Sequence, residues 1–449
     1  MIAILEHRLL RLVLVLAALL AALPAMAATV IRDAEIEDTI HRIADPVFEV
    51  AGLDRDSIDV YILQDPTLNA FVSGGQNLFV NTGLIVRTSN PDELRGVIAH
   101  ETGHIAGGHL SRTVEARDQA LAKTLLGAVL GVAAAVAGAP EVGTALMLGG
   151  ASFGQSGVLA FSRSQEQSAD QAAVNYLERL HESPEGLRDF FEVLDTQNLR
   201  ISGGGNVYFR THPLTQDRIR FMDDQVARSP YKGQHMTGEA VEAHRRMVAK
   251  LDGFLSNPQD VLRRRASDSI PDRYARAVAL YRVPDVPGAV AIIDGLIGDE
   301  PANPYFHELK GQILFENGRV AEAVPPYREA LRYRPDSALI RLGLARALLE
   351  KGDPAGADEA VALLEEATRL EPRNPGAWRF LGIAYGKAGR EGMASMALAE
   401  QAVLVGDKND ARLYIRRAEN LIQPNDPNWI HLQDLVRAVD DMPNPQRRR

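Results

Sequence analysis

The carboxyl-terminal part of this sequence repeats with a nearly constant period, which restricts its fold more than any other feature does. Units that begin at positions 270, 304, 338 and 375 are spaced by 34, 34 and 37 residues. Small and apolar residues return at equivalent places in each unit, such as Gly311, Leu314 and Tyr327 in the second. The period predicts stacked helix pairs, because small residues let paired helices approach closely and each unit buries its apolar face against its neighbours.

The fourth unit also carries a known consensus. The pattern W-x-x-L-G-x-x-Y, which begins a tetratricopeptide helix pair, is reproduced by Trp378, Leu381, Gly382 and Tyr385. The resemblance implies an all-α tetratricopeptide solenoid over residues 272–440, with terminal capping helices and then a disordered tail at 441–449. Three extra residues in the third unit are assigned to its inter-helix turn.

Residues 1–27 have the composition of a secretory signal peptide. Arg8 and Arg11 precede an apolar run from Leu12 to Leu23, and a small-x-small cleavage site ends at Ala27. Cleavage after Ala27 would release an exported protein. A retained membrane anchor is the alternative, although the run is short for a membrane span.

The composition excludes several classes of protein. With 46% hydrophobic and 6% aromatic residues, most of the chain is expected to fold. The absence of cysteine excludes disulfides, a lipoprotein anchor and thiolate metal ligands, so any metal must be held by His, Asp or Glu. The formal net charge of −10, without a basic stripe, gives no support for a nucleic-acid partner.

Residues 28–256 mix strand-like and helical stretches and are predicted to form an α+β domain. Residues 58–86 alternate apolar and polar side chains around Asp-Pro and Gly-Gly, which indicates strands joined by a turn or bulge in a small sheet. The polar stretch 257–271 is interpreted as a linker with a short helix.

A glycine-rich apolar insertion, residues 124–162, interrupts this domain. Its two uncharged runs, 124–140 and 142–162, contain 17 and 21 residues. Internal Gly, Pro, Gln and Ser favour a helical insertion that packs on the protein or makes peripheral contact with a membrane. A membrane-spanning hairpin, and hence an integral membrane protease, is the alternative.

The motif His100-Glu101-Thr102-Gly103-His104 is H-E-x-x-H. Its helix is predicted to start after an N-cap at Ser89 or Asn90. Residues four apart differ by about 40° around a helix, so both imidazoles can point at one metal ion. Glu101 lies beside them and can take a proton from a metal-bound water.

A catalytic zinc usually has three protein ligands, and Glu166 is the best candidate for the third. Asp170 follows four residues later on the same helical face, where its carboxylate can accept the second N–H of a ligand histidine. The alternative is that Glu166 is only a first-turn residue favoured by the helix dipole.

These residues resemble the HtpX-like and BepA-like zinc peptidases, a group of gluzincins. The resemblance covers the whole mature chain through NAFVSGGQNLFVNTGL, HETGHIAGGH, EQSAD and THPLTQDRI, at residues 69–84, 100–109, 166–170 and 211–219. The signal peptide and the repeats match the BepA-like branch, which is periplasmic. The resemblance implies a zincin-type domain with one Zn²⁺ per chain, held by His100, His104 and Glu166, and Glu101 as general base.

Two further residues enter through this resemblance. His212 lies in a loop that can approach the zinc as a fourth ligand and keep the enzyme latent, which we favour, or it can stabilise the transition state. Arg218 either pairs with a carboxylate near the site or anchors the loop.

His109 and one strand complete the candidate site. If the helix continues past Gly107 and Gly108, His109 points well away from the ligand histidines, so we expect it to have a structural or surface role. Residues Asn69, Ala70 and Phe71 are predicted to form an edge strand where an extended substrate adds main-chain hydrogen bonds, or simply to complete the sheet.

The resemblance leads to one expected function and one alternative. The first is a zinc endopeptidase that cleaves misfolded or misassembled envelope and outer-membrane proteins, with polypeptides as substrates and assembly proteins docked on the repeats. The alternative is a chaperone-like tetratricopeptide scaffold for outer-membrane protein assembly, with a largely latent protease.

Overall fold

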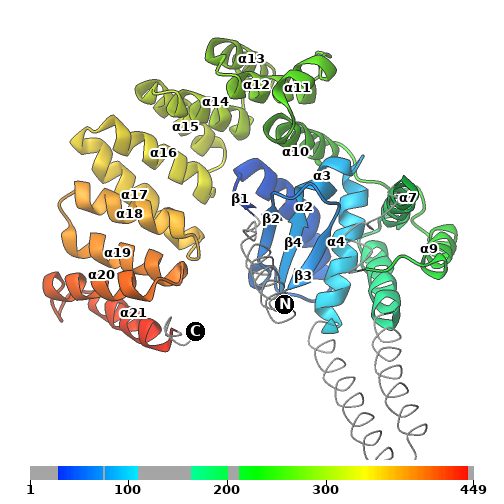
Figure 1. Cartoon of the computed structure of the whole chain (residues 1–449), viewed down its shortest axis with the longest axis horizontal. Helices are drawn as coiled ribbons and strands as arrows, with labels where there is room; N and C mark the ends of the chain where they lie inside the picture. The colour runs from blue at the N-terminus through cyan, green and yellow to red at the C-terminus, as the bar shows by residue number, and fades with distance from the viewer. Residues whose placement is uncertain (1–28, 74–75, 110–162, 201–211, 443–449) are drawn as a thin grey trace, which may run out of the picture.

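The computed structural model describes residues 29–73, 76–109, 163–200 and 212–442 of the chain. A mixed α/β domain precedes an arc of paired helices (Figure 1), which confirms the predicted fold class. The predicted signal peptide and the apolar insertion at 124–162 lie outside the described residues. Within the described residues, no helix has both the length and the apolarity needed to cross a membrane.

The α/β domain contains one small sheet with strand order β1-β2-β4-β3. Its strands are β1 (Val30–Ile31), β2 (Val60–Leu63), β3 (Ala70–Ser73) and β4 (Asn77–Asn81). β2 and β4 are parallel, and the two outer pairs are antiparallel. β3 is therefore an edge strand of the sheet, and α4 (Pro91–Ala106) runs beside it (Figure 1).

The end of the strand-like stretch is a helix, which corrects the prediction that residues 58–86 form strands. The helix α3 (Thr82–Arg87) follows β4 directly. A Cβ on Gly83 would lie 2.2 Å from the carbonyl oxygen of Pro66, so this helix packs tightly under the loop before β3. Its apolar run is too short for periodicity to distinguish a buried helix from a strand.

Helices build the core of the domain together with the sheet. They are α2 (Ala34–Val50), α4, a helix over residues 163–179, α7 (Glu185–Arg200), α9 (Gln216–Arg228) and α10 (Glu239–Leu255), and a short 3₁₀ turn spans Arg55–Ser57. Phe48 of α2, Leu94 of α4 and Phe190 of α7 are fully buried in one cluster with Leu78 of β4. α4 is thereby fixed along most of its length in the core.

The start of α4 has the expected cap. The Asn90 side chain accepts a hydrogen bond from the backbone N–H of Glu93, and the Glu93 carboxylate accepts one from the N–H of Ser89 at 3.0 Å. This reciprocal pair satisfies amides that the first turn of the helix leaves without partners. The prediction of a helix start at this point is confirmed.

The repeat helices begin at the predicted positions. The first helices of the four units start at Ile270, Pro304, Ala338 and Pro375. The pairs are α12 (Ile270–Arg282) with α13 (Val286–Asp299), α14 (Pro304–Glu316) with α15 (Val320–Tyr333), α16 (Ala338–Lys351) with α17 (Pro354–Leu370), and α18 (Pro375–Lys387) with α19 (Glu391–Leu404). Two more helices, α20 (Lys408–Leu421) and α21 (Trp429–Asp441), pack on α19.

The glycines of the repeats permit the expected close packing. A Cβ on Gly311 or on Gly343 would lie 2.8 or 2.7 Å from the ring of Tyr327. Tyr327 of α15 therefore fits between α14 and α16 only because both positions lack a side chain.

The three extra residues of the third unit lie in a helix, which corrects their assignment to the inter-helix turn. α17 has 17 residues, whereas α15 has 14. Asp353 caps α17 by accepting a hydrogen bond from the N–H of Gly356, and Pro354 occupies its first turn. This N-cap leaves only two residues between α16 and α17. The added length therefore extends α17 and not the turn before it.

The repeat array contacts the α/β domain at several points along its inner side. α11 (Pro258–Arg264) lies in the predicted linker 257–271, and its Val261 packs with Ala249 of α10 and Ala275 of α12. In α12 the Tyr274 hydroxyl donates to Glu35 at 2.7 Å, and further along the array Arg373 pairs with Asp59 at 2.5 Å. The array thus curves around the side of the domain that carries β1 and α2 (Figure 1).

Candidate metal centre

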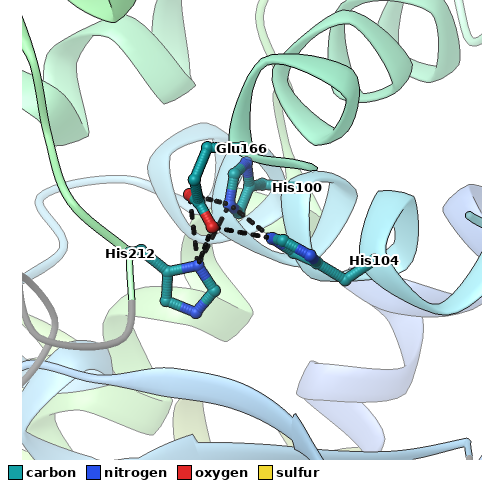
Figure 2. A group of neighbouring side chains, drawn as sticks. All are labelled: His100, His104, Glu166 and His212. Carbon is teal, nitrogen blue, oxygen red and sulfur yellow. Dashed lines mark hydrogen bonds and ion pairs between the residues drawn. The ribbon is translucent and has the colours of Figure 1, made fainter. Parts of the chain in front are cut away.

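Four side chains from three separate segments converge in the α/β domain (Figure 2). His100 and His104 come from α4, Glu166 from helix 163–179, and His212 from the loop before α9. Each offers one possible ligand atom, and these atoms all lie within 4.8 Å of one another. His100, Glu166 and His212 are at most 6% exposed.

Four pairs of possible ligand atoms in this group have short and similar separations. Nε2 of His100 lies 3.2 Å from Nε2 of His104 and 3.4 Å from Oε2 of Glu166. Nδ1 of His212 lies 3.4 Å from Nε2 of His100 and 3.2 Å from Oε1 of Glu166. Four ligands at the usual zinc distances in a tetrahedron are about 3.3 Å apart, and these four separations match that value.

A glycine inside the motif brings the two ligand-bearing helices together. A Cβ on Gly103 would lie 3.0 Å from the Cα of Ala169, which is on helix 163–179. The backbones of α4 and helix 163–179 approach closely at this point, one turn from Glu166. A larger residue at position 103 would separate the histidines from the carboxylate.

Asp170 and Arg218 surround the ligands as a second layer. Asp170 Oδ1 lies 3.0 Å from Nδ1 of His100, on the ring side opposite Nε2. Arg218 donates two hydrogen bonds to Asp170, at 2.7 and 2.8 Å, and its third nitrogen lies 2.8 Å from Glu166 Oε2. Arg218 also donates to the carbonyl of Pro213, so it both pairs with carboxylates and holds the His212 loop.

Glu101 is fully buried next to this group. Neither of its carboxylate oxygens has a hydrogen-bond partner among the described residues, and the nearest charged contact joins Oε1 to His212 Nε2 at 3.4 Å. A buried carboxylate without partners is costly for the fold, which marks the position as a functional one.

Burial and nearby charges shift the pKa values of these groups. Burial lowers the pKa of His104 to about 4, so its imidazole is neutral and can bind a metal. Burial opposes protonation of His100, but hydrogen bonds to Asp170 and Glu166 outweigh it and raise its pKa to about 9. Burial raises the pKa of Glu101, against the effect of the nearby imidazoles.

His109 lies closer to the centre than the sequence indicated. The helix α4 ends at Ala106, and Gly108 has a φ of 60°, so the regular helical path is interrupted before His109. The His109 ring is buried, and its Nδ1 lies 2.9 Å from Nδ1 of His104. The expected surface position assumed a continuous helix. The glycine pair that ends it was the available signal.

Two of the three residues of the predicted substrate strand lie in the edge strand β3, and Asn69 directly precedes it. Ala70 and Phe71 are in β3, opposite Val80 and Phe79 of β4. Asn69 and Ala70 are buried, and Phe71 is half-buried. No described strand pairs with the outer edge of β3.

The fold and this site together define a metalloprotease. An H-E-x-x-H helix with a buried glutamate beside its first histidine and a second glutamate from another helix make up the characteristic arrangement of such enzymes. Residues 31–226 match Peptidase family M48, and residues 274–332 and 309–357 match the tetratricopeptide repeat. These matches place an M48-like peptidase domain before tetratricopeptide repeats along the chain.

Similar proteins match this chain over most of their length. The beta-barrel assembly-enhancing protease of Yersinia pestis is 26% identical over 392 residues, which cover 86% of this chain and 79% of that protein. The beta-barrel assembly-enhancing protease of Escherichia coli K12 is 25% identical over 81% of this chain and 74% of its own. The crystal structure of MamA is similar at 15% identity over 37% of this chain and 93% of that one, with a TM-score of 0.29. The relatives confirm the resemblance to BepA-like peptidases.

Proposed function

We propose that this chain is an exported zinc endopeptidase that hydrolyses peptide bonds in misfolded or misassembled envelope proteins. The observation that carries the proposal is the convergence of His100, His104 and Glu166 next to the buried Glu101 carboxylate, which accepts no hydrogen bond from the described residues. Outer-membrane proteins are the substrates we favour, because the similar proteins are named for beta-barrel assembly.

The donor atoms and the charge of the site suit one divalent ion per chain. Two imidazole nitrogens and a carboxylate oxygen are typical ligands of catalytic zinc. The carboxylates of Glu101, Glu166 and Asp170 with the guanidinium of Arg218 give a formal charge of −2 when the imidazoles are neutral. Bound zinc would supply a water with a pKa near 7 and polarise the scissile carbonyl.

Glu101 is the proposed general base. Its burial and its lack of hydrogen-bond partners keep the carboxylate available to an attacking water. Having taken that proton, it can deliver it to the leaving amine in the second half of the reaction. Asp170 and Arg218 hold the ring of His100 during these steps, since Asp170 contacts the nitrogen that faces away from the group.

The edge strand β3 is the proposed binding site for the substrate backbone. β3 runs beside α4, and a substrate in extended form can add to its outer edge through main-chain hydrogen bonds. Such binding depends little on side chains, as a protease for unfolded proteins requires. Asn69, Ala70 and Phe71 are the positions where substrate would lie.

His212 is proposed to keep the resting enzyme latent. Its Nδ1 belongs to the group of four ligand atoms, and its Nε2 faces Glu101 at 3.4 Å. In this position the imidazole fills the fourth place of a tetrahedral site and also separates the base from substrate. Substitution His212→Ala should therefore raise cleavage of an unfolded substrate, whereas a fall in activity would assign His212 to transition-state stabilisation instead.

Location and partners follow from the rest of the chain. Residues 1–27 are proposed to direct export to the periplasm, and the apolar insertion 124–162 to make peripheral contact with a membrane. The repeats are proposed to dock proteins of outer-membrane assembly on their exposed surfaces. These assignments rest on the sequence pattern and on the relatives.

The activity is tested with purified protein and zinc. Wild type should degrade an unfolded reporter protein, and Glu101→Gln should reduce the rate roughly 100- to 10,000-fold while it still binds zinc. Equal rates for wild type and Glu101→Gln would refute the assignment of the base. Lack of zinc binding by wild type would refute the metal site itself.

A chaperone-like scaffold with a largely latent protease is the second candidate, and the position of His212 favours it. It predicts that cells carrying Glu101→Gln keep most of the function that deletion of the gene removes. If Glu101→Gln and the deletion have the same phenotype, the scaffold function is excluded as the main one.

A further inference from the structure

The two ligand histidines of α4 have different partners on their outer nitrogens. His100 presents Nδ1 to a carboxylate, Asp170, at 3.0 Å. His104 presents Nδ1 to a second imidazole, that of His109, at 2.9 Å. His109 is not one of the four residues whose ligand atoms converge.

The chain has several features that place His109 over the end of α4. Gly108, with a φ of 60°, has a backbone conformation that favours glycine and interrupts the helical path after α4. A Cβ on Gly107 would lie 2.5 Å from Nε2 of His109, so the ring fits only against a glycine. The backbone carbonyl of His109 accepts a hydrogen bond from the Gln165 side chain at 2.8 Å.

Gln165 adjoins the third proposed ligand in the sequence. Its hydrogen bond therefore connects the backbone of His109 to the start of helix 163–179, next to Glu166. The end of α4, the His109 ring and the glutamate are fixed relative to one another. His109 as a whole residue is only 5% exposed. Water therefore competes little with the contact between its ring and His104.

The direction of the hydrogen bond between His104 and His109 follows from the chemistry of imidazole. A neutral imidazole that offers the lone pair of Nε2 to a metal carries its proton on Nδ1. Nδ1 of His104 must then be the donor, and Nδ1 of His109 the acceptor. His109 in turn has to carry its own proton on Nε2.

We propose that His109 is a positioning residue of the metal centre, which fixes the ring orientation and the tautomer of His104. This proposal rests on the zinc site proposed above and extends it. Asp170 orients one ligand histidine through a charged acceptor, and His109 orients the other through a neutral acceptor. Partners of this kind commonly change metal affinity on the order of 10- to 100-fold when they are removed.

Two substitutions at position 109 separate the acceptor from the ring. His109→Asn places an amide oxygen close to where Nδ1 stands, so it keeps an acceptor for His104. The leucine side chain of His109→Leu branches at the same carbon as asparagine but offers no acceptor. It therefore leaves the Nδ1–H of His104 without its His109 partner. His244→Leu is the matched control, because His244 is also a buried histidine but contacts Thr88, before the start of α4.

Zinc affinity, measured by competition with a chelator, is the main readout. His109→Leu should bind zinc on the order of 10- to 100-fold more weakly than wild type. His109→Asn and His244→Leu should stay close to wild type, and the Co²⁺ absorption spectrum should change only in His109→Leu. Wild-type affinity in His109→Leu, or an equal loss in His109→Asn, would overturn the proposal.

The wild-type protein provides a test that does not depend on a folded variant. With zinc bound and histidines labelled with ¹⁵N, NMR should show the proton of His104 on Nδ1 and that of His109 on Nε2. A proton on Nδ1 of His109 would overturn the proposal while leaving the zinc site intact. Failure of wild type to bind zinc would instead refute the proposed function.

Discussion

The metal centre is built from residues far apart in the sequence, whereas the repeat array is built from contacts between neighbouring segments. His100, Glu166 and His212 are far apart in the sequence, yet their ligand atoms lie within 4.8 Å of one another. The repeat helices pack chiefly against the next helix in the chain, and their buried residues are almost all apolar. A substitution at the metal centre should therefore affect several segments at once, whereas one in the repeats should act locally.

Arg218→Met is expected to have the largest effect on stability. Arg218 pairs with both Asp170 and Glu166 in a buried site, and its loss leaves two carboxylates without their cation. We expect the metal-free protein to lose about 3–5 kcal/mol of unfolding free energy, and zinc to bind more weakly. Chemical denaturation with and without zinc measures both.

Arg220→Met is the matched control for this prediction. Arg220 is two residues away on α9, with an exposed side chain that pairs with Asp217. It should change stability by less than about 0.5 kcal/mol. Similar losses in both variants would mean that the metal centre has no special sensitivity.

Leu364→Ala should destabilise the repeats without changing the chemistry. Leu364 of α17 is completely buried among residues of neighbouring repeat helices. The cavity should cost about 2–5 kcal/mol, seen as faster hydrogen exchange in α16 to α19, while zinc affinity stays constant. Leu413→Ala, at a residue that is 38% exposed, serves as the control and should leave exchange nearly unchanged. Weaker zinc binding in Leu364→Ala would break the distinction between the two regions.

Glu308 of α14 lies where the repeat array meets the α/β domain, close to Lys250, and should make the free energy of unfolding depend on pH. Burial raises the pKa of Glu308 to about 8, and Lys250 opposes this shift. Its folded pKa lies above the ordinary value of 4.5, so its contribution is fully present below pH 4.5 and is lost as the pH rises through about 8. The unfolding free energy should therefore fall between pH 5 and pH 9.

Glu308→Gln should flatten this fall, because the amide does not ionise. Unfolding curves at a series of pH values would measure it. Glu322→Gln, at an exposed position that pairs with Arg319, should retain the wild-type slope in the same interval. An unchanged slope in Glu308→Gln would assign the pH dependence to other groups.

The smallest effect is expected at the exposed contact between the domain and the array. Arg373 and Asp59 form an ion pair at 2.5 Å, but the Arg373 side chain is 77% exposed. Their coupling energy in a double-mutant cycle should be about 0–1 kcal/mol and should fall with added salt. A larger coupling would show that this pair helps to fix the array against the domain.

The same difference in range explains what the sequence could predict. The starts of α12, α14, α16 and α18 were predicted at their observed residues, because each helix pair is specified by residues within its own unit. The extension of α17 was misplaced, since a repeat pattern does not reveal whether added residues lengthen a turn or a helix. The cap at Asp353 decides it.

In the α/β domain, local patterns were sufficient only for local features. The cap of α4 and the spacing of its histidines were predicted, and the structure brings Glu166 and His212 to them. The contact of His109 with His104 was not predicted, because it depends on the break in the helix at Gly107 and Gly108, which the helical periodicity does not express. α3 was mistaken for strand because its buried run is short.

The hydrogen bond from Gln165 to the carbonyl of His109 also bears on how this family can change its length. The bond joins the two described ends of the segment 110–162 beside the ligand-bearing helices. The bond itself does not depend on the number of residues between those ends, so it can hold them together when residues are gained or lost there. The segment between these two residues is therefore a place where evolution or protein engineering can insert additional sequence next to the catalytic centre.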